Sequence, residues 1–197
     1  MVKIRYYEDR DELEWVRCRV LSFLDCSYYD DVKTKKEEYE NPSICLVAVD
    51  EKSVVGLIDI EVEIANGEIC SNEHKGTGAV IWHLAVMPEY RNQGIASWLW
   101  KEALKDLPNY GVSWVEAWTQ GDKPANSWYK KNGFKLLNKH TWLRCYADSP
   151  ADFLDSKKLG KVYGTEQLIF DAPKSRYSEL KDKCSRIEKV RLYGINL

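Results

Sequence analysis

The segment Leu84-Ala-Val-Met-Pro-Glu-Tyr-Arg-Asn-Gln-Gly-Ile-Ala96 decides the fold of this chain. It begins as an apolar strand, breaks at Pro88 and turns through Arg91 and Gly94 into an amphipathic helix. The start of a helix presents backbone N–H groups without acceptors and the positive end of the helix dipole, and both attract phosphate. Gly94 has no Cβ, so the backbone can approach a ligand closely there. The sequence therefore predicts a phosphate or pyrophosphate site at this turn.

The turn resembles the acyl-CoA-binding motif of the GCN5-related N-acetyltransferase (GNAT) superfamily, Arg/Gln-x-x-Gly-x-Gly/Ala. Six residues alone recur by chance, and an ordinary β–α turn is the alternative, but here a strand precedes the motif and a helix follows it. The resemblance implies acetyl-CoA as co-substrate. The implied cofactor-binding residues run from the strand end to the helix start: Leu84, Ala85, Val86, Arg91, Asn92, Gln93, Gly94, Ile95 and Ala96.

Residues 122–134 resemble a second GNAT signature, N-x-x-A-x-x-x-Y-x-x-x-G-F. Four positions match at the family spacing: Ala125, Tyr129, Gly133 and Phe134. Asp122 replaces the family asparagine, so we expect Asn126 to contact the pantetheine arm instead. In the family this tyrosine lies near the thioester sulfur, and a phenol, protonated at neutral pH, can donate a proton to the leaving thiolate. The alternative for Tyr129 is a packing role.

Transfer to an amine requires a base, because only the neutral amine attacks. The family often places it on the strand before the motif, where this chain has Val80 and Ile81. His83 is the ionisable group of that strand, and imidazole titrates near neutral pH. Glu116 competes from the next predicted strand, where burial between two tryptophans would make it a stronger base. A chain of water molecules is the third possibility, and His83 can also be a satisfied core residue.

The resemblance assigns the oxyanion contact to the backbone N–H near Val86, where the central strand leaves its neighbour. The acceptor amine is expected between the first helices and the strand ends. Acidic and aromatic side chains there suit a cation, although a solvated edge would have the same composition. The candidates are Tyr28, Tyr29, Asp30, Asp31, Asp59, Glu61 and Glu63.

Composition narrows the class of protein. The chain has 197 residues and a formal net charge of −2, so it fits one domain and lacks the basic surface of a nucleic-acid-binding protein. No run approaches the ~18 apolar residues of a membrane span, and the polar start is not a signal peptide. The six cysteines include no C-x-x-C pair and the three histidines have no metal-ligand spacing. We therefore expect reduced thiols, no metal and a cytoplasmic location. The expected partner is a small-molecule amine, and a homodimer stays open.

The order of predicted elements, β-α-α-β-β-β-α-β-α-β, is that of the acyl-CoA N-acyltransferase fold. The expected class is α/β (α+β), with a mixed, mostly antiparallel central sheet flanked by helices on both faces. We assign residues 1–146 to the acetyltransferase domain and residues 147–197 to a C-terminal extension packed on it. Expected strands cover residues 2–7, 44–49, 54–64, 79–86, 113–119, 134–146, 167–170 and 189–193, and expected helices follow Asp11, Gly94 and Asp122 and lie within 28–40 and 175–184.

These features predict an acetyl-CoA-dependent N-acetyltransferase that transfers the acetyl group directly to a primary amine in a ternary complex. No cysteine lies in either motif to suggest a covalent acyl-enzyme. Two alternatives stay open at this stage. One is a transferase that uses a longer acyl-CoA, and the other is a CoA-binding sensor that has no turnover.

Overall fold

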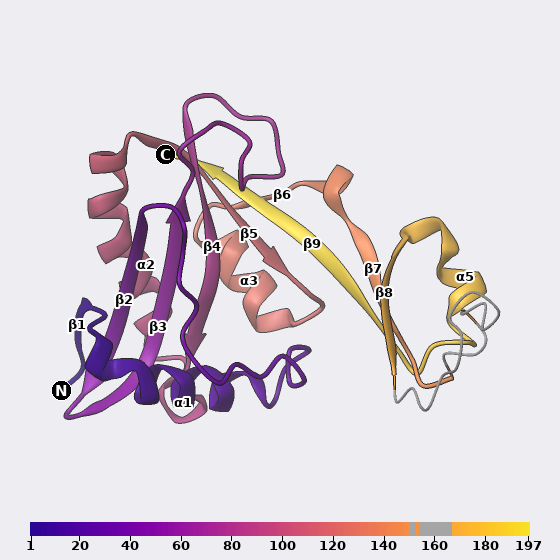
Figure 1. Cartoon of the computed structure of the whole chain (residues 1–197), viewed down its shortest axis with the longest axis horizontal. Coiled ribbons are helices and arrows are strands. Elements are labelled where there is room, and N and C mark those ends of the chain that lie inside the picture. Colours follow the sequence, from indigo (N-terminus) through magenta and orange to yellow (C-terminus); the bar gives the residue numbers. More distant parts are fainter. Residues whose placement is uncertain (150–152, 154–166) are drawn as a thin grey trace.

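The computed structural model describes residues 1–149, 153 and 167–197, and its described part is built on a nine-stranded, mostly antiparallel sheet (Figure 1). The strands are β1 (Lys3–Tyr6), β2 (Ser43–Asp50), β3 (Ser53–Val62), β4 (Thr77–Val86), β5 (Val112–Thr119), β6 (Lys135–Leu136), β7 (Trp142–Ala147), β8 (Leu168–Pro173) and β9 (Arg186–Asn196). The α-helices are α1 (Glu12–Phe23), α2 (Ile95–Asp106), α3 (Lys123–Lys131) and α5 (Tyr177–Leu180). The expected fold class is confirmed.

The strand order is β1-β2-β3-β4-β5-β9-β7-β8, and β6 also pairs with β9. The neighbours β4 and β5 are parallel, and their last paired residues are Ile81 and Ala117. One residue later Trp82 bulges, because β3 pairs its Asp59 with His83 and its Ile60 with Ile81. From this bulge onward β4 pairs only with β3 and no longer with β5. A gap between two parallel strands thus opens in the middle of the sheet.

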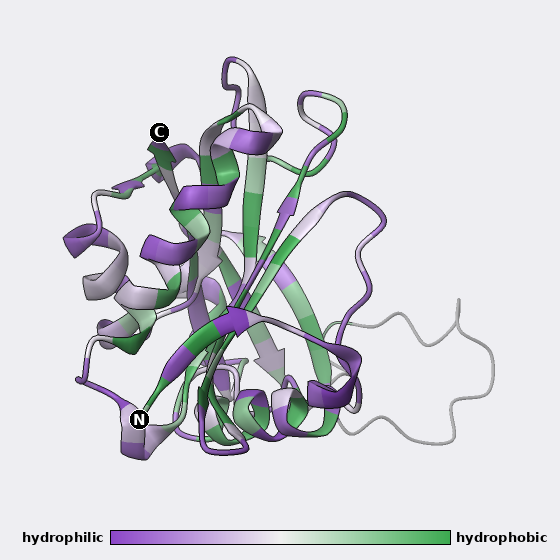
Figure 2. Ribbon diagram, turned by 90° about the vertical axis from the view of Figure 1, so that its left-hand side faces the viewer, coloured by the Kyte–Doolittle hydropathy of each residue, from purple (hydrophilic) through white to green (hydrophobic). Residues whose placement is uncertain are grey.

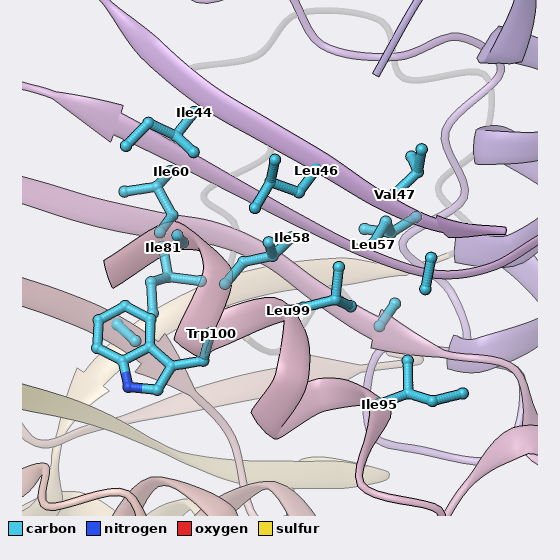
Figure 3. Packing of buried hydrophobic residues seen from close by; sticks show 14 of the residues in the cluster. Ile44, Leu46, Val47, Leu57, Ile58, Ile60, Ile81, Ile95, Leu99 and Trp100 are labelled. Carbon is cyan, nitrogen blue, oxygen red and sulfur yellow. The ribbon is translucent and has the colours of Figure 1, made fainter. Parts of the chain in front are cut away.

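Helices cover both faces of the sheet. On one face, Ile95 and Leu99 of α2 come within contact distance of a Cβ built on Gly56 of β3, and Figure 3 shows Leu99 among the isoleucines of the strands. Helix α3 lies beside α2, since Trp128 donates to Ser97 Oγ at 3.1 Å. Helix α1 covers the opposite face, where its buried Trp15 packs edge-on against the ring of His83. The two faces therefore offer separate approaches to the gap.

The C-terminal residues complete the sheet. Strand β9 pairs with β5 through residues 191–196 and with β7 through residues 186–190, so it joins the main sheet to a smaller one. The smaller sheet has its own core, centred on Leu143, Cys145, Ala172 and Leu180. The strand expected over residues 134–146 is instead two strands, β6 and β7, separated by a turn, and the expected helix 175–184 is reduced to the short α5.

The helix expected within residues 28–40 is wrong. This segment is a series of turns and extended residues between α1 and β2. Its charged side chains reach inward: Lys36 Nζ lies 3.3 Å from the buried Asp59 carboxylate, and Glu37 Oε2 lies 2.6 Å from His83 Nε2. These contacts with residues distant in sequence override the helical propensity of a Lys- and Glu-rich sequence.

Apolar residues follow the strands and the inner sides of the helices, and polar residues follow the loops (Figure 2). In the part of the chain that the structure describes, no helix is long and apolar enough to cross a membrane. All six cysteines lie in described positions and are free thiols.

Candidate active site

The turn before α2 has the geometry of a phosphate site. Gly94, at the N-cap, has φ +82°, and a Cβ placed there would have no heavy atom within 4 Å. The first hydrogen bond of the helix runs from the Trp98 N–H to the Gly94 carbonyl at 2.9 Å. The N–H groups of residues 95–97 therefore have no acceptor within the helix. An open, positively polarised helix start lies where the motif predicts it.

Arg91 is more constrained than the sequence indicates. Its guanidinium donates to the Val86 carbonyl (3.2 Å), to the Ser22 carbonyl (2.7 Å) and to both carboxylate oxygens of Asp25 (2.6 and 2.9 Å). Four of the five N–H donors of an arginine are thereby used. The Arg91 hydrogen bonds lower the pKa of Asp25. Arg91 thus joins the end of β4 to the end of α1, with one donor left for a phosphate.

Backbone groups of β4 face the gap between β4 and β5. The Met87 N–H donates to the Val55 carbonyl at 3.0 Å, so the facing pair Gly56–Val86 does not exchange hydrogen bonds. The N–H and C=O groups of Val86, and by alternation those of Leu84, therefore point away from β3 and into the gap. The backbone groups of Ala85 point to β3 instead. Two of the three predicted strand residues can thus offer backbone hydrogen bonds to a ligand.

Tyr129 packs on β9 at the level where the gap starts. Ile81, Ala117 and Tyr193 form a row across β4, β5 and β9, and the ring of Tyr129 stacks on Tyr193 at a centroid distance of 5.2 Å. Among the described residues, the Tyr129 hydroxyl has no hydrogen-bond partner. Burial raises the pKa of Tyr129 above that of a free phenol. A buried, protonated phenol with a free hydroxyl is suited to donate a proton.

Asn126 and Asp122 are occupied by protein partners. The Asn126 amide donates to the carbonyls of Gln120 (2.7 Å) and Asp122 (2.8 Å), and its oxygen accepts from Tyr193 (3.0 Å). A contact of Asn126 with a pantetheine arm would require one of these bonds to exchange. The Asp122 side chain makes no hydrogen bond to the start of α3. Its carboxylate instead accepts hydrogen bonds from the N–H and hydroxyl of Ser27. These bonds fix the loop that borders the gap.

His83 is buried, and both of its ring nitrogens are engaged. Arg19 Nε–H donates to Nδ1 at 3.3 Å, and Nε2 lies 2.6 Å from Glu37 Oε2. Since Nδ1 accepts, the neutral ring carries its proton on Nε2 and donates it to the carboxylate. This bond, with that from Lys33, lowers the pKa of Glu37 to about 2 although burial opposes the shift. His83 therefore acts only together with Glu37.

Glu116 is held as a structural acceptor. Its fully buried carboxylate accepts from the N–H groups of Ser71 and Asn72 and from Trp114 Nε1, each at 2.8 Å. These donors fasten the loop of residues 63–76 to β5. We therefore do not retain Glu116 as a candidate base.

A cavity of about 630 Å³ lies on the α1 face beside the bulge. Its walls include Glu37, Tyr39, Glu61 and the half-exposed Trp82. One feature of the sequence could have indicated this cavity: Trp82 and His83 are adjacent in an otherwise apolar strand. The sequence could not indicate a role for Glu37, because the charged run that contains it is equally typical of a solvated helix.

The acidic residues expected to attract the amine already have partners in the protein. Asp31 pairs with Arg19 (2.8 Å), Asp30 with Arg186 (2.5 Å), Asp59 with Lys36 (3.3 Å) and Glu63 with His74 (2.5 Å), and Glu61 accepts from Trp82 Nε1 (2.7 Å). Of the expected aromatic residues, Tyr29 packs on Arg186 and burial raises the pKa of Tyr28. Each of these acidic side chains is therefore already engaged by a group of the protein itself.

Comparison with known proteins agrees with this geometry. The model of the acetyltransferase (GNAT) family matches residues 8–134, which include both motifs. The chain belongs to the GNAT acetyltransferase family. No curated protein matches this GNAT chain by sequence.

Solved structures share the GNAT fold at low identity. The PaiA N-acetyltransferase of Thermoplasma acidophilum, in complex with coenzyme A, is 20% identical over 70% of this chain and 91% of its own, with a TM-score of 0.54. Arabidopsis thaliana NAA60 with a bisubstrate analogue is 15% identical over 100% of this chain and 98% of its own (TM-score 0.59). The ribosomal-protein-S18-alanine N-acetyltransferase of Escherichia coli is 12% identical over 100% and 94% (TM-score 0.57).

Proposed function

We propose that this GNAT protein transfers the acetyl group of acetyl-CoA directly to a primary amine. The observation that carries the proposal is the pairing of the open Gly94 turn with the gap that begins at Trp82. The turn offers unpaired N–H groups to the pyrophosphate. The gap offers the Leu84 backbone groups to the pantetheine arm and the Val86 N–H to the thioester, because the Val86 carbonyl already accepts from Arg91. Similar structures that hold coenzyme A or acetyl-CoA support this placement.

The thioester and the amine reach the gap from opposite faces of the sheet. Tyr129 lies on the face of α2 and α3, close to where the sulfur would leave, and the cavity lies on the face of α1. The Val86 N–H points into the gap, so it can stabilise negative charge on the thioester oxygen. The amine attacks the carbonyl carbon, the C–S bond breaks, and Tyr129 protonates the thiolate.

The amine binds near Glu37. Lys33 Nζ lies 2.5 Å from Glu37 Oε1, at the wall of the cavity, and shows that this carboxylate accepts an ammonium group. An acceptor amine would replace Lys33 there. The Glu37 carboxylate, held by the Nε2–H of His83, or water beside it, then takes the proton that the amine loses.

Release of free thiol from acetyl-CoA, measured over a panel of small amines and peptide N-termini, tests the proposal. Turnover with at least one amine supports an acetyltransferase. If the protein binds CoA but releases no thiol with any amine, the sensor alternative replaces the proposal. Faster release of thiol from a longer acyl-CoA than from acetyl-CoA would favour a transferase specific for that longer acyl group.

A further inference from the structure

Three donor atoms of different chemistry meet in the loop that joins β3 to β4. They are the carboxylate of Glu63, the thiol of Cys70 and the imidazole of His74, and all three atoms lie within 4.8 Å of one another. The side chains of Glu63 and His74 are 1% and 2% exposed, and Cys70 is buried. The cluster lies beside the first residues of β4. The Gly94 turn follows the other end of that strand, so the cluster is separate from the proposed transfer site.

The hydrogen bonds of His74 leave a lone pair aimed at a carboxylate. Its Nδ1 lies 2.9 Å from the carbonyl of Asn72, which can only accept, so Nδ1 carries a proton. In the neutral ring Nε2 is then unprotonated, yet it lies 2.5 Å from Glu63 Oε1. Two acceptors at this separation need a proton or a metal cation shared between them.

Gly78 shows how closely the three donors converge. A Cβ placed there would lie 2.5 Å from Cys70 Sγ and 2.6 Å from both Glu63 Oε1 and His74 Nε2. The three atoms therefore lie on a circle of radius no greater than about 2.6 Å, because one point is that close to all of them. A zinc ion binds at about 2.3 Å from sulfur and 2.0–2.2 Å from nitrogen or oxygen. The three donors thus lie near the spacing of a zinc site, and the Nε2–Oε1 separation would have to widen from 2.5 Å to bind the ion.

We infer that Glu63, Cys70 and His74 form a site for a divalent transition-metal ion, best suited to Zn²⁺. Sulfur and imidazole ligands favour zinc over magnesium or calcium. A thiolate and a carboxylate would balance the charge of the ion in this buried position. The surrounding bonds also orient the ligands: Glu63 accepts from the N–H groups of Gly67 (3.1 Å), Cys70 (3.3 Å) and Gly78 (3.0 Å). The ion would fasten the loop to the sheet, with its fourth position open to water or another ligand.

The test uses the full-length protein, reduced and stripped of metal with a chelator, and Co²⁺ as the spectroscopic probe. We expect one equivalent of Co²⁺ to produce a thiolate-to-cobalt charge-transfer band, which Zn²⁺ then removes. Cys70→Ser should abolish the band. Cys26→Ser is the matched control, because Cys26 donates to the Phe23 carbonyl at 3.2 Å and a serine can do the same.

His74→Gln provides a second variant in case Cys70→Ser does not fold. It should weaken Zn²⁺ binding at least tenfold, and Zn²⁺ should raise the Tm of the wild-type protein but not that of this variant. The inference is wrong if the wild-type protein gives no band, or if the band persists in Cys70→Ser. It is also wrong if the Cys26→Ser control loses the band to the same extent. His74 and Glu63 would then be a hydrogen-bonded ion pair that holds the loop without metal.

Discussion

The two ends of β4 use glycine in opposite ways. Beyond its C-terminal end, Gly94 faces open space, and among the described residues no side chain caps the N–H groups at the start of α2. At its N-terminal end, a Cβ added to Gly78 would lie within 2.6 Å of three polar atoms, and these atoms lie within 4.8 Å of one another. Hydrogen-bond donors without partners, as at the Gly94 turn, indicate a ligand that binds reversibly. Metal-ligand atoms that converge, as beside Gly78, indicate a site with a structural role.

Gly94→Val gives the largest expected effect. The substitution places a β-branched side chain where the phosphate approaches, so CoA binding should fall below detection by calorimetry. Gly67→Val is the matched control, because Gly67 also has a left-handed φ (+80°) with nothing near its missing Cβ. Both variants should lose similar stability from backbone strain, and only the first should lose CoA. Unchanged CoA affinity in Gly94→Val would contradict the phosphate site.

Tyr129→Phe should lower kcat by about 10²–10⁴-fold, the usual contribution of a general acid, and leave CoA affinity unchanged. Tyr193→Phe is the control, since it removes a hydroxyl from the stacked partner ring and leaves the proton donor in place. Single-turnover rates of both variants make the comparison. A loss below about threefold in Tyr129→Phe, with chemistry rate-limiting, would assign Tyr129 to packing.

The pH profile of kcat/KM tests the Glu37–His83 pair. We expect kcat/KM to rise with pH as the pair loses a proton, and Glu37, whose pKa is about 2, stays ionised throughout this rise. His83→Gln should remove this limb, whereas Glu116→Gln should leave it in place. A limb that survives in both variants would report the ionisation of the amine, with the proton leaving through water.

Gly78→Ala tests the crowded end of β4. The added methyl group would overlap all three donors, so we expect a loss of about 1–3 kcal/mol in the free energy of unfolding, as for other overpacked sites. CoA affinity should not change, because the Gly94 turn is distant along the strand. Denaturant unfolding and calorimetry check the two quantities. A Gly78→Ala variant as stable as the wild type would show that the donors do not converge as described.

Asp25→Asn should have the smallest effect. Arg91 lowers the pKa of Asp25, so the ion pair stabilises the fold above the ordinary carboxyl pKa, and this contribution is lost as the pH falls through the lowered value. Because the Asp25 side chain is 55% exposed, we expect less than about 1 kcal/mol at pH 7. The stability difference from wild type should shrink below about pH 4. A constant difference from pH 7 to pH 3 would contradict this.

The local signals in the sequence were sufficient for most of the fold. Apolar runs fixed β2, β3 and β4, and the Gly94 and Asp122 turns fixed the starts of α2 and α3, because strand alternation and helix starts depend on neighbouring residues. The same reasoning failed within residues 28–40. There the structure depends on where Lys36 and Glu37 find partners, and those partners, Asp59 and His83, are distant in sequence.

The sequence by itself determined the family and the position of the phosphate turn, since both reside in contiguous motifs whose geometry is local. Only the tertiary structure decided how the remaining groups are used. In the folded chain Glu116 accepts from three N–H donors, and Arg91 bridges the ends of β4 and α1. His83 pairs with Glu37 at the wall of the cavity. It also brought together Glu63, Cys70 and His74, whose spacing matches no metal motif. These outcomes depend on which strands and loops pack together, and no local pattern of residues encodes that.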